Sequence, residues 1–276
     1  MAQISAAAVQ SLRTKTGLPM MDCKRALEEA DGDQEKAIEA LRKAGAKTME
    51  KRAGRATTFG RIALYTEFAG KKATMIDLRC ESAPVATNEE FVRLAGDLAQ
   101  QLATGPGAKT PEELLGQPSP SKPGQTLQHQ FDDLNNRIRE VFRLERIVRI
   151  DASCGGYAHH NGAVGVLLEV EGGNAELAKE VCMHVAAMRP VALKSDEVDP
   201  ARVAKEREIA AEVARREGKP EKIIEKIVDG RLKAFFAECC LLEQPFVKDP
   251  SKSVAKYAED GGMKIVRFVH WELPKE

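Results

Sequence analysis

The chain is 276 residues long and carries 42 basic and 42 acidic side chains, so its formal net charge is zero. A chain of this length is expected to form about two domains of ~150 residues each, with a core that needs no disulfide or metal. This balance argues against a generic nucleic-acid binder, because such proteins usually carry an excess of basic side chains that contact the phosphates. Charged residues make up 30% of the chain and aromatic residues 5%, which indicates a soluble, helix-rich protein with an aliphatic core.

The cysteines and the N-terminal residues indicate the cellular compartment. No two of the six cysteines stand in a C-x-x-C spacing, so neither a zinc knuckle nor a thioredoxin-like redox motif is expected. The adjacent Cys239 and Cys240 end an apolar helical stretch, where small buried side chains are commoner than redox sensors. The chain starts without a signal-peptide pattern, and no apolar run approaches the ~18 residues of a membrane span. We therefore expect a cytoplasmic protein with reduced thiols and no membrane contact.

Residues 1–46 have the helical spacing of a compact three-helix module. Ser5 is placed to cap the first helix, and Pro19 suits the start of the second. Asp33 is placed to cap the third helix, and Gly45 is expected to end it.

Residues 47–57 are expected to form a linker. The stretch has no sustained apolar face and is rich in basic side chains. A solvated tether is favoured over an arm that binds nucleic acid. The charged residues in question are Lys47, Glu50, Lys51, Arg52 and Arg55.

Residues 58–142 change to an alternating pattern and predict a first α+β subdomain. The Ala-Gly-Lys-Lys sequence at 69–72 is typical of a hairpin turn between two strands. A loop rich in Gly, Pro, Ser and Lys is expected between the two helices that follow. The expected elements are strands at 61–68 and 74–79, a helix capped by Asn88, a loop at 104–124 and a helix over about 127–142.

Residues 143–276 partly repeat this pattern and predict a second α+β subdomain. Aligning Asn88 with Asn174 superimposes the apolar positions of the helices that they cap, although the match is too loose to prove duplication. A Gly-Lys-Pro break at 218–220 between two charge-rich helices indicates an antiparallel helical hairpin. The expected elements are strands at 146–151 and 163–170, a helix capped by Asn174, the hairpin at about 199–240 and a strand at 264–272.

The sequence shows none of the common catalytic or nucleotide-binding motifs. It lacks a phosphate-binding loop, a G-x-G-x-x-G turn, a G-x-S-x-G elbow and an H-E-x-x-H pair. His159 and His160 are the only histidine cluster, and no further ligand stands at a spacing that would complete a metal site. We therefore expect no catalytic residue, cofactor or metal, and a protein that acts by binding.

Several segments closely resemble bacterial elongation factor Ts, in the order in which that family has them. Together they span nearly the whole chain. The first is L-R-x-x-T-G-x-x-M-M-D-C-K-x-A-L at 12–27. Later matches include Y-x-H at 157–159, M-H-V-A-A at 183–187, G-K-P-x-K-I at 218–223 and Q-P-F-V-x-x-P-S at 244–251.

The resemblance implies both a fold and a function. Family members have an N-terminal three-helix, ubiquitin-associated-like domain, a core of two α+β subdomains and a projecting antiparallel helical hairpin. They bind the GTPase elongation factor Tu and speed GDP release by disturbing its Mg²⁺ and phosphate site. The resemblance thus implies a nucleotide exchange factor with no nucleotide site, cofactor or covalent catalysis of its own.

The sequence departs from the family at one functional segment. Where the family has Thr-Asp-Phe-Val, this chain has Ser82, Ala83, Pro84 and Val85. Ala83 has no carboxylate, and Pro84 has less bulk than an aromatic side chain. We hypothesise that the 82–85 segment still docks on the partner, through the stiff Pro84 turn or with weaker effect. The alternative is a plain strand-to-helix turn.

Four further residues match partner-binding positions of the family: Arg13, Met20, Met21 and His159. Met21 could instead pack inside the helical module, and His159 could be an ordinary turn residue. The chain stops soon after Pro274, where some members add a helical module that contacts the GTPase, so we expect that contact to be missing.

Two other functions stay open. One is a chaperone of the same fold that binds Tu without accelerating exchange. The other is an RNA-binding adaptor that uses residues 47–55, although no direct nucleic-acid contact is expected. A homodimer or a heterotetramer with Tu is also compatible with the sequence.

Overall fold

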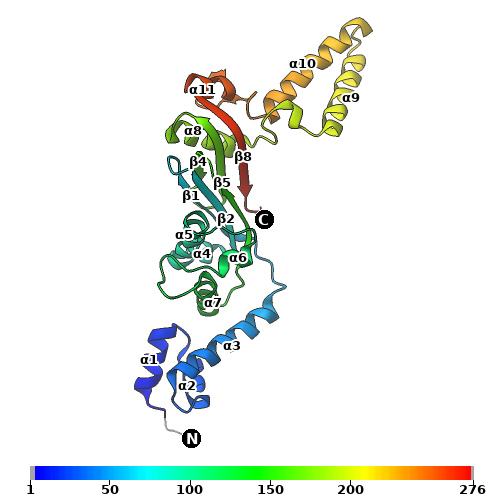
Figure 1. Ribbon diagram of the computed structural model, residues 1–276. Coiled ribbons are helices and arrows are strands. Elements are labelled where there is room, and N and C mark those ends of the chain that lie inside the picture. The colour runs from blue at the N-terminus through cyan, green and yellow to red at the C-terminus, as the bar shows by residue number, and fades with distance from the viewer. Residues whose placement is uncertain (1–3, 275–276) are drawn as a thin grey trace.

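The computed structural model describes residues 4–274 and shows an elongated molecule of the α+β class (Figure 1). Three helices lie at one end, two three-stranded antiparallel sheets with their helices lie in the middle, and a helical pair projects from the other end. Strands β6 (Pro245–Phe246) and β7 (Asp249–Ser253) form a further two-stranded sheet. None of the described helices is long and apolar enough to span a membrane.

The N-terminal helices form a module whose caps follow from its sequence. These helices are α1 (Ala6–Thr16), α2 (Met20–Glu29) and α3 (Gln34–Arg52). The hydroxyl of Ser5 accepts the Ala8 N–H, and the carboxylate of Asp33 accepts two backbone N–H groups of the first turn of α3. Leu12, Leu27 and Ala37 are fully buried between the helices. We refer to residues 4–52 as the N-terminal module.

The expectation that Gly45 ends the third helix is wrong. Helix α3 continues to Arg52 and takes in the first half of the expected 47–57 linker. Gly45 marks a close approach between helices, because a Cβ at this position would stand 2.2 Å from Oδ1 of Asn136 in the core. A glycine that permits such packing has the same sequence signature as one that ends a helix.

The first sheet has the order β1-β2-β3, and all its neighbours are antiparallel. Its strands are β1 (Phe59–Glu67), β2 (Lys72–Cys80) and β3 (Arg143–Ile150). Helix α5 (Glu89–Thr104), capped by Asn88 as expected, covers one face. The smaller helices beside it are α4 (Ala83–Ala86), α6 (Pro111–Leu115) and α7 (Leu127–Ile138).

Helix α7 ends four residues earlier than expected. Arg139 takes a left-handed conformation with φ of 64° and closes the helix at Ile138. Residues 139–142 therefore form a turn that leads into β3. A non-glycine residue in this conformation gives no sequence signal.

The second sheet has the order β4-β5-β8 and packs on the first. Its strands are β4 (Cys154–Ala158), β5 (Val164–Gly172) and β8 (Met263–Glu272). Side chains that alternate along β2 contact different layers: Met75 joins the cluster between the sheets, and Ile76 joins the cluster under α5. Helix α8 (Ala175–Met188), capped by Asn174, packs on the second sheet.

The remaining elements complete the second half of the chain. Helices α9 (Pro200–Arg216) and α10 (Glu221–Cys239) pack together through an apolar cluster and project from the body (Figure 1). Gly218, with φ of 71°, lies in the turn between them. A short η1 turn (Ser195–Glu197) precedes this pair of helices. After α10 the chain returns through strands β6 and β7 and helix α11 (Val254–Asp260).

Candidate functional site

The 82–85 segment lies at the end of the first sheet, between β2 and α5. Ser82 occupies the N-cap position of the four-residue helix α4, and Pro84 lies in its first turn. Ala83 and Pro84 are exposed, whereas Val85 packs against the core under α5. The structure thus presents two small, uncharged side chains to solvent on a turn held at both ends.

Hydrogen bonds from a distant turn hold the first residues of this segment. The carboxylate of Glu140 accepts the Ser82 hydroxyl at 2.5 Å and the backbone N–H groups of Ser82 and Glu81 at 3.1 and 3.2 Å. In return, the carboxylate of Glu81 accepts the Val141 N–H at 2.7 Å and a guanidinium N–H of Arg55 at 3.1 Å. Sequence reasoning missed Glu140, because it lies 58 residues from Ser82 and outside any motif.

Cys80, which immediately precedes this segment, is a packing residue. All six cysteines are free and buried, as expected for small apolar side chains. Burial raises the pKa of the Cys80 thiol to about 12, and the nearby carboxylates of Glu140 and Glu81 add to the rise. A thiol with such a pKa stays protonated and unreactive at neutral pH.

Arg13, Met20 and Met21 lie at one end of the N-terminal module. Arg13 is exposed one turn before the end of α1, and Met20 and Met21 begin α2 after a short loop. Met20 is 47% exposed and Met21 63% exposed, so the alternative that Met21 packs inside the module is wrong. Two exposed methionines form an apolar, adaptable surface.

His159 lies in the loop between β4 and β5. Its Nδ1 is 2.8 Å from the Tyr157 hydroxyl, and its ring lies 4.3 Å from that of His160, centroid to centroid. The same loop reaches β1, because the Gly162 carbonyl accepts the Ile62 N–H at 2.7 Å. His159 is therefore fixed within a tight turn and only partly exposed.

The structure brings the β4–β5 loop and the 82–85 segment to one groove. This groove has a volume of about 430 Å³, and its lining includes Ala83 from the segment and Asn161 and Ala163 from the loop. The exposed methionines line no part of it and belong to α2, in the three-helix module at the end of the molecule (Figure 1). Two of the expected partner-binding regions are therefore adjacent, and the third is separate.

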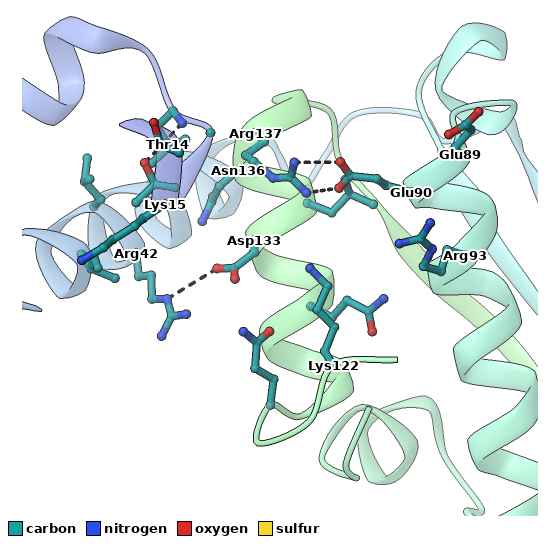
Figure 2. Close-up of a pocket in the computed structure, with 18 residues that line it drawn as sticks. Thr14, Lys15, Arg42, Glu89, Glu90, Arg93, Lys122, Asp133, Asn136 and Arg137 are labelled. Atoms are coloured by element: carbon teal, nitrogen blue, oxygen red, sulfur yellow. Dashed lines mark hydrogen bonds and ion pairs between the residues drawn. The ribbon is translucent and has the colours of Figure 1, made fainter. Parts of the chain in front are cut away.

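A charged cleft of about 560 Å³ separates the N-terminal module from the core, as Figure 2 shows. Arg137 of α7 forms a two-pronged ion pair with Glu90 of α5, and this hydrogen bonding lowers the pKa of the Glu90 carboxyl. Arg42 of α3 lies 3.4 Å from Asp133 of α7, across the cleft. The cleft is thus where the module docks on α7. Sequence reasoning did not anticipate it.

The described residues offer no group of three or more His, Cys, Asp or Glu side chains that could hold a metal ion. His159 and His160 belong to no such group among these residues. The exposed features of the site are a turn at 83–84, the groove beside it and the methionines of α2, which suit contact with a macromolecule.

Comparison with known proteins identifies the family. A family model described as Elongation factor TS matches residues 81–275. Elongation factor Ts of Thioalkalivibrio sulfidiphilus is 40% identical over 273 residues, covering 98% of this chain and 92% of the relative. Elongation factor Ts of Clostridium botulinum strain Eklund 17B is also 40% identical, over 283 residues with the same coverage. That of Methylococcus capsulatus is 39% identical over 272 residues, again covering 98% and 92%. The chain therefore belongs to the elongation factor Ts family, whose members act in translation elongation.

Proposed function

We propose that this protein binds elongation factor Tu in its GDP-bound form and promotes exchange of GDP for GTP. The observation that carries the proposal is the position of the 82–85 segment. It occupies the place of the family's Thr-Asp-Phe-Val segment and exposes Ala83 and Pro84 on a braced turn beside the β4–β5 loop.

Exchange is a matter of coupled binding. A factor that binds nucleotide-free Tu more tightly than Tu·GDP must weaken GDP binding by the same factor. A coupling free energy of about 3 kcal/mol corresponds to roughly 150-fold in affinity. The Mg²⁺ ion at the phosphates of Tu is an effective target, because it carries much of the local charge balance.

The chemistry of this segment limits how it can act. Ala83 brings no carboxylate, so the segment cannot compete electrostatically for Mg²⁺. Pro84 fixes its own φ and removes one backbone donor, which makes the turn a stiff wedge. We therefore propose a steric displacement of the elements of Tu that surround the Mg²⁺ and phosphate site.

The proposal extends to partner-binding residues and to domain boundaries. Arg13, Met20 and Met21 would contact the GTPase domain of Tu, and His159 would belong to a second contact. The domains would be a ubiquitin-associated-like bundle up to Arg52, a short linker up to residue 57, and two core subdomains, the second with the hairpin at about 199–240. The expected boundary between residues 142 and 143 is wrong, because β3 pairs with β2 in the first sheet, so the first core subdomain would run from residue 58 to about 150. The protein would work in the cytoplasm, as a homodimer or a heterotetramer with Tu.

The same departure at Ala83 and Pro84 favours a second candidate, a Tu-binding chaperone that does not accelerate exchange. An RNA-binding adaptor is less well supported. Of the basic residues that such an adaptor would use, Arg52 donates to the Arg139 carbonyl at 2.6 Å and Arg55 pairs with Glu81.

Release of a fluorescent GDP analogue from the cognate Tu separates the two main candidates. An exchange factor accelerates release, whereas a chaperone is retained by Tu in a pull-down and leaves the rate unchanged. Deleting residues 82–85 should abolish the acceleration, and unchanged exchange would reject docking by this segment. If the wedge is a weakened form of the family segment, Ala83→Asp and Pro84→Phe should raise the rate. Ala69→Asp, in the exposed β1–β2 turn, is the matched control.

A further inference from the structure

We propose that Glu140 is a positioning residue that holds the 82–85 segment in the geometry required for nucleotide exchange. The inference rests on the proposed function and assigns a role to a side chain outside the segment itself. Glu140 is partly buried in the turn that follows α7 and does not belong to the exposed face of the segment.

The first argument is the hydrogen bond that the Ser82 hydroxyl makes. A serine in an N-cap position ordinarily accepts a backbone N–H of its own helix. Ser82 makes no such cap and donates its hydroxyl to Glu140 at 2.5 Å. The entry of α4 is thus fixed by a tertiary contact in place of a local one.

The second argument is that both carboxylate oxygens of Glu140 are used to hold the start of the segment. One carboxylate oxygen of Glu140 takes the hydroxyl of Ser82, and the other takes the backbone N–H groups of Glu81 and Ser82. Three hydrogen bonds from two consecutive residues therefore converge on one side chain. A helix of only four residues cannot hold its own geometry, because helix nucleation is unfavourable.

The third argument is that the contact is reciprocal. Strands β2 and β3 pair as far as Arg79 and Arg143, and the turns beyond this pair would otherwise be free to separate. The carboxylate of Glu81 accepts the Val141 N–H, while the carboxylate of Glu140 accepts donors from residues 81 and 82. The two acidic side chains thus extend the connection between the strands to the edge of the segment.

Loss of Glu140 is expected to lower the maximal rate of GDP release more than the affinity for Tu. If Glu140 only orders the segment, its loss leaves the main contact surfaces for Tu intact. The population of productively placed segments then falls, and with it the maximal rate of GDP release. Misplacing a reacting element by about 1 Å can cost ~100-fold in rate, so a tenfold fall is within reach.

The decisive experiment measures GDP release from cognate Tu over a range of concentrations of the full-length factor. Glu140→Ala should lower the maximal release rate about tenfold and leave the half-saturating concentration within twofold of wild type. Glu140→Gln should restore the rate. Its carbonyl can accept the two backbone N–H groups, and its amide can donate to the Ser82 hydroxyl. Glu145→Ala, an exposed change on β3, is the matched control and should behave as wild type.

A double-mutant cycle tests whether Glu140 acts through Ser82. Ser82→Ala should lower the maximal rate less than Glu140→Ala, and the double variant should be no slower than Glu140→Ala alone. Hydrogen exchange at the amides of Glu81 and Ser82 should become faster in Glu140→Ala, in the absence of Tu, and stay slow in Glu140→Gln.

Two results would overturn the inference. One is an unchanged maximal rate in Glu140→Ala while the wild-type factor accelerates release. The other is a slow Glu140→Gln variant, since only a role of the charge itself would then remain. If the wild-type factor fails to accelerate release at all, the proposed function is rejected and this inference falls with it.

Discussion

The guanidinium of Arg139 donates to the carboxylate of Asp22 across 2.7 Å and so joins α2 to the turn that ends α7. The same turn accepts a hydrogen bond from Arg52 through the Arg139 carbonyl and carries Glu140 as its next residue. The N-terminal module and the 82–85 segment are therefore held by two successive residues of one turn. In the proposed complex, Tu would contact the exposed methionines of α2, and α2 is joined to this same turn through Asp22.

The ion pair between Arg139 and Asp22 should contribute little to stability. The side chains are 53% and 33% exposed, so water screens their attraction. A double-mutant cycle with Asp22→Ala and Arg139→Gly, measured by urea unfolding, should give a coupling energy of about 0.2–1 kcal/mol. Glycine suits the left-handed conformation at 139, so the change isolates the side chain. A coupling that persists at high salt would contradict this prediction.

Gly155→Ala should destabilise the second sheet. An added Cβ in β4 would stand 2.6 Å from the carbonyl carbon of Ala178 in α8, a backbone atom that cannot move aside cheaply. Overpacking of this kind costs about 1–3 kcal/mol, which a lower urea midpoint would report. Gly230→Ala in α10 is the control, because no described atom apart from its chain neighbours and the nearby backbone of its own helix stands within 4 Å of the added Cβ. It should stabilise the protein by about 0.5–1 kcal/mol, and an equal loss in both variants would reject the packing argument.

Local signals in the sequence predict where four of the helices begin. Ser5, Asp33, Asn88 and Asn174 each cap the helix expected of them, because a cap involves only neighbouring residues. The helix end expected at Gly45 is wrong because this glycine serves a tertiary contact, in which it allows α3 to approach Asn136.

The candidate site shows the same division between local and tertiary signals. The 82–85 segment and the methionines are identified by their resemblance to family positions. The contact of Glu140 with Ser82 connects residues 58 positions apart, and spacing along the chain cannot reveal it. The αL conformation of Arg139, which presents the next residue to the segment, likewise has no signature in the sequence.

Stability should fall as the pH is lowered below about 6.5, in part because of His184. This residue is buried, and burial lowers the pKa of its imidazole. Its Nδ1 accepts the Val247 N–H at 3.2 Å, and its Nε2 lies 2.9 Å from Oε1 of Gln244, so the neutral ring fits the site. Because the folded-state pKa lies below the unfolded value, the stabilisation is present above the unfolded pKa. It is lost as pH falls through the folded one.

A comparison of variants isolates this contribution. Urea unfolding of the wild type from pH 7 to pH 5 should show a decline that is shallower in His184→Gln. His160→Gln, an exposed change, should keep the wild-type slope. Some decline should remain in every variant, because burial lowers the pKa of His270 as well. An identical slope in wild type and His184→Gln would contradict the assignment.

The thiols should resist alkylation in the folded protein. Burial raises the pKa of Cys80, Cys154 and Cys240 to about 12, and all six cysteines are shielded from solvent. Iodoacetamide at pH 8 should therefore leave the native protein unmodified by intact mass, and should modify all six thiols in denaturant. Rapid labelling of Cys239 or Cys240 in the native state would show that the base of the hairpin opens.

Met20 and Met21 should contribute to the affinity for Tu without setting the maximal rate of exchange. Both side chains are exposed, on a module that is joined to the core by polar contacts, and methionine is among the residues enriched at protein interfaces. The double change Met20→Ala and Met21→Ala should raise the half-saturating concentration about tenfold and leave the maximal GDP release rate unchanged. This is the opposite of the pattern expected for Glu140→Ala. Ile223→Ala, which truncates a 43% exposed side chain on α10, is the control for lost apolar surface. An unchanged half-saturating concentration in the methionine variant would remove the N-terminal module from the proposed interface, because no other described feature of α2 offers Tu an apolar surface of this size.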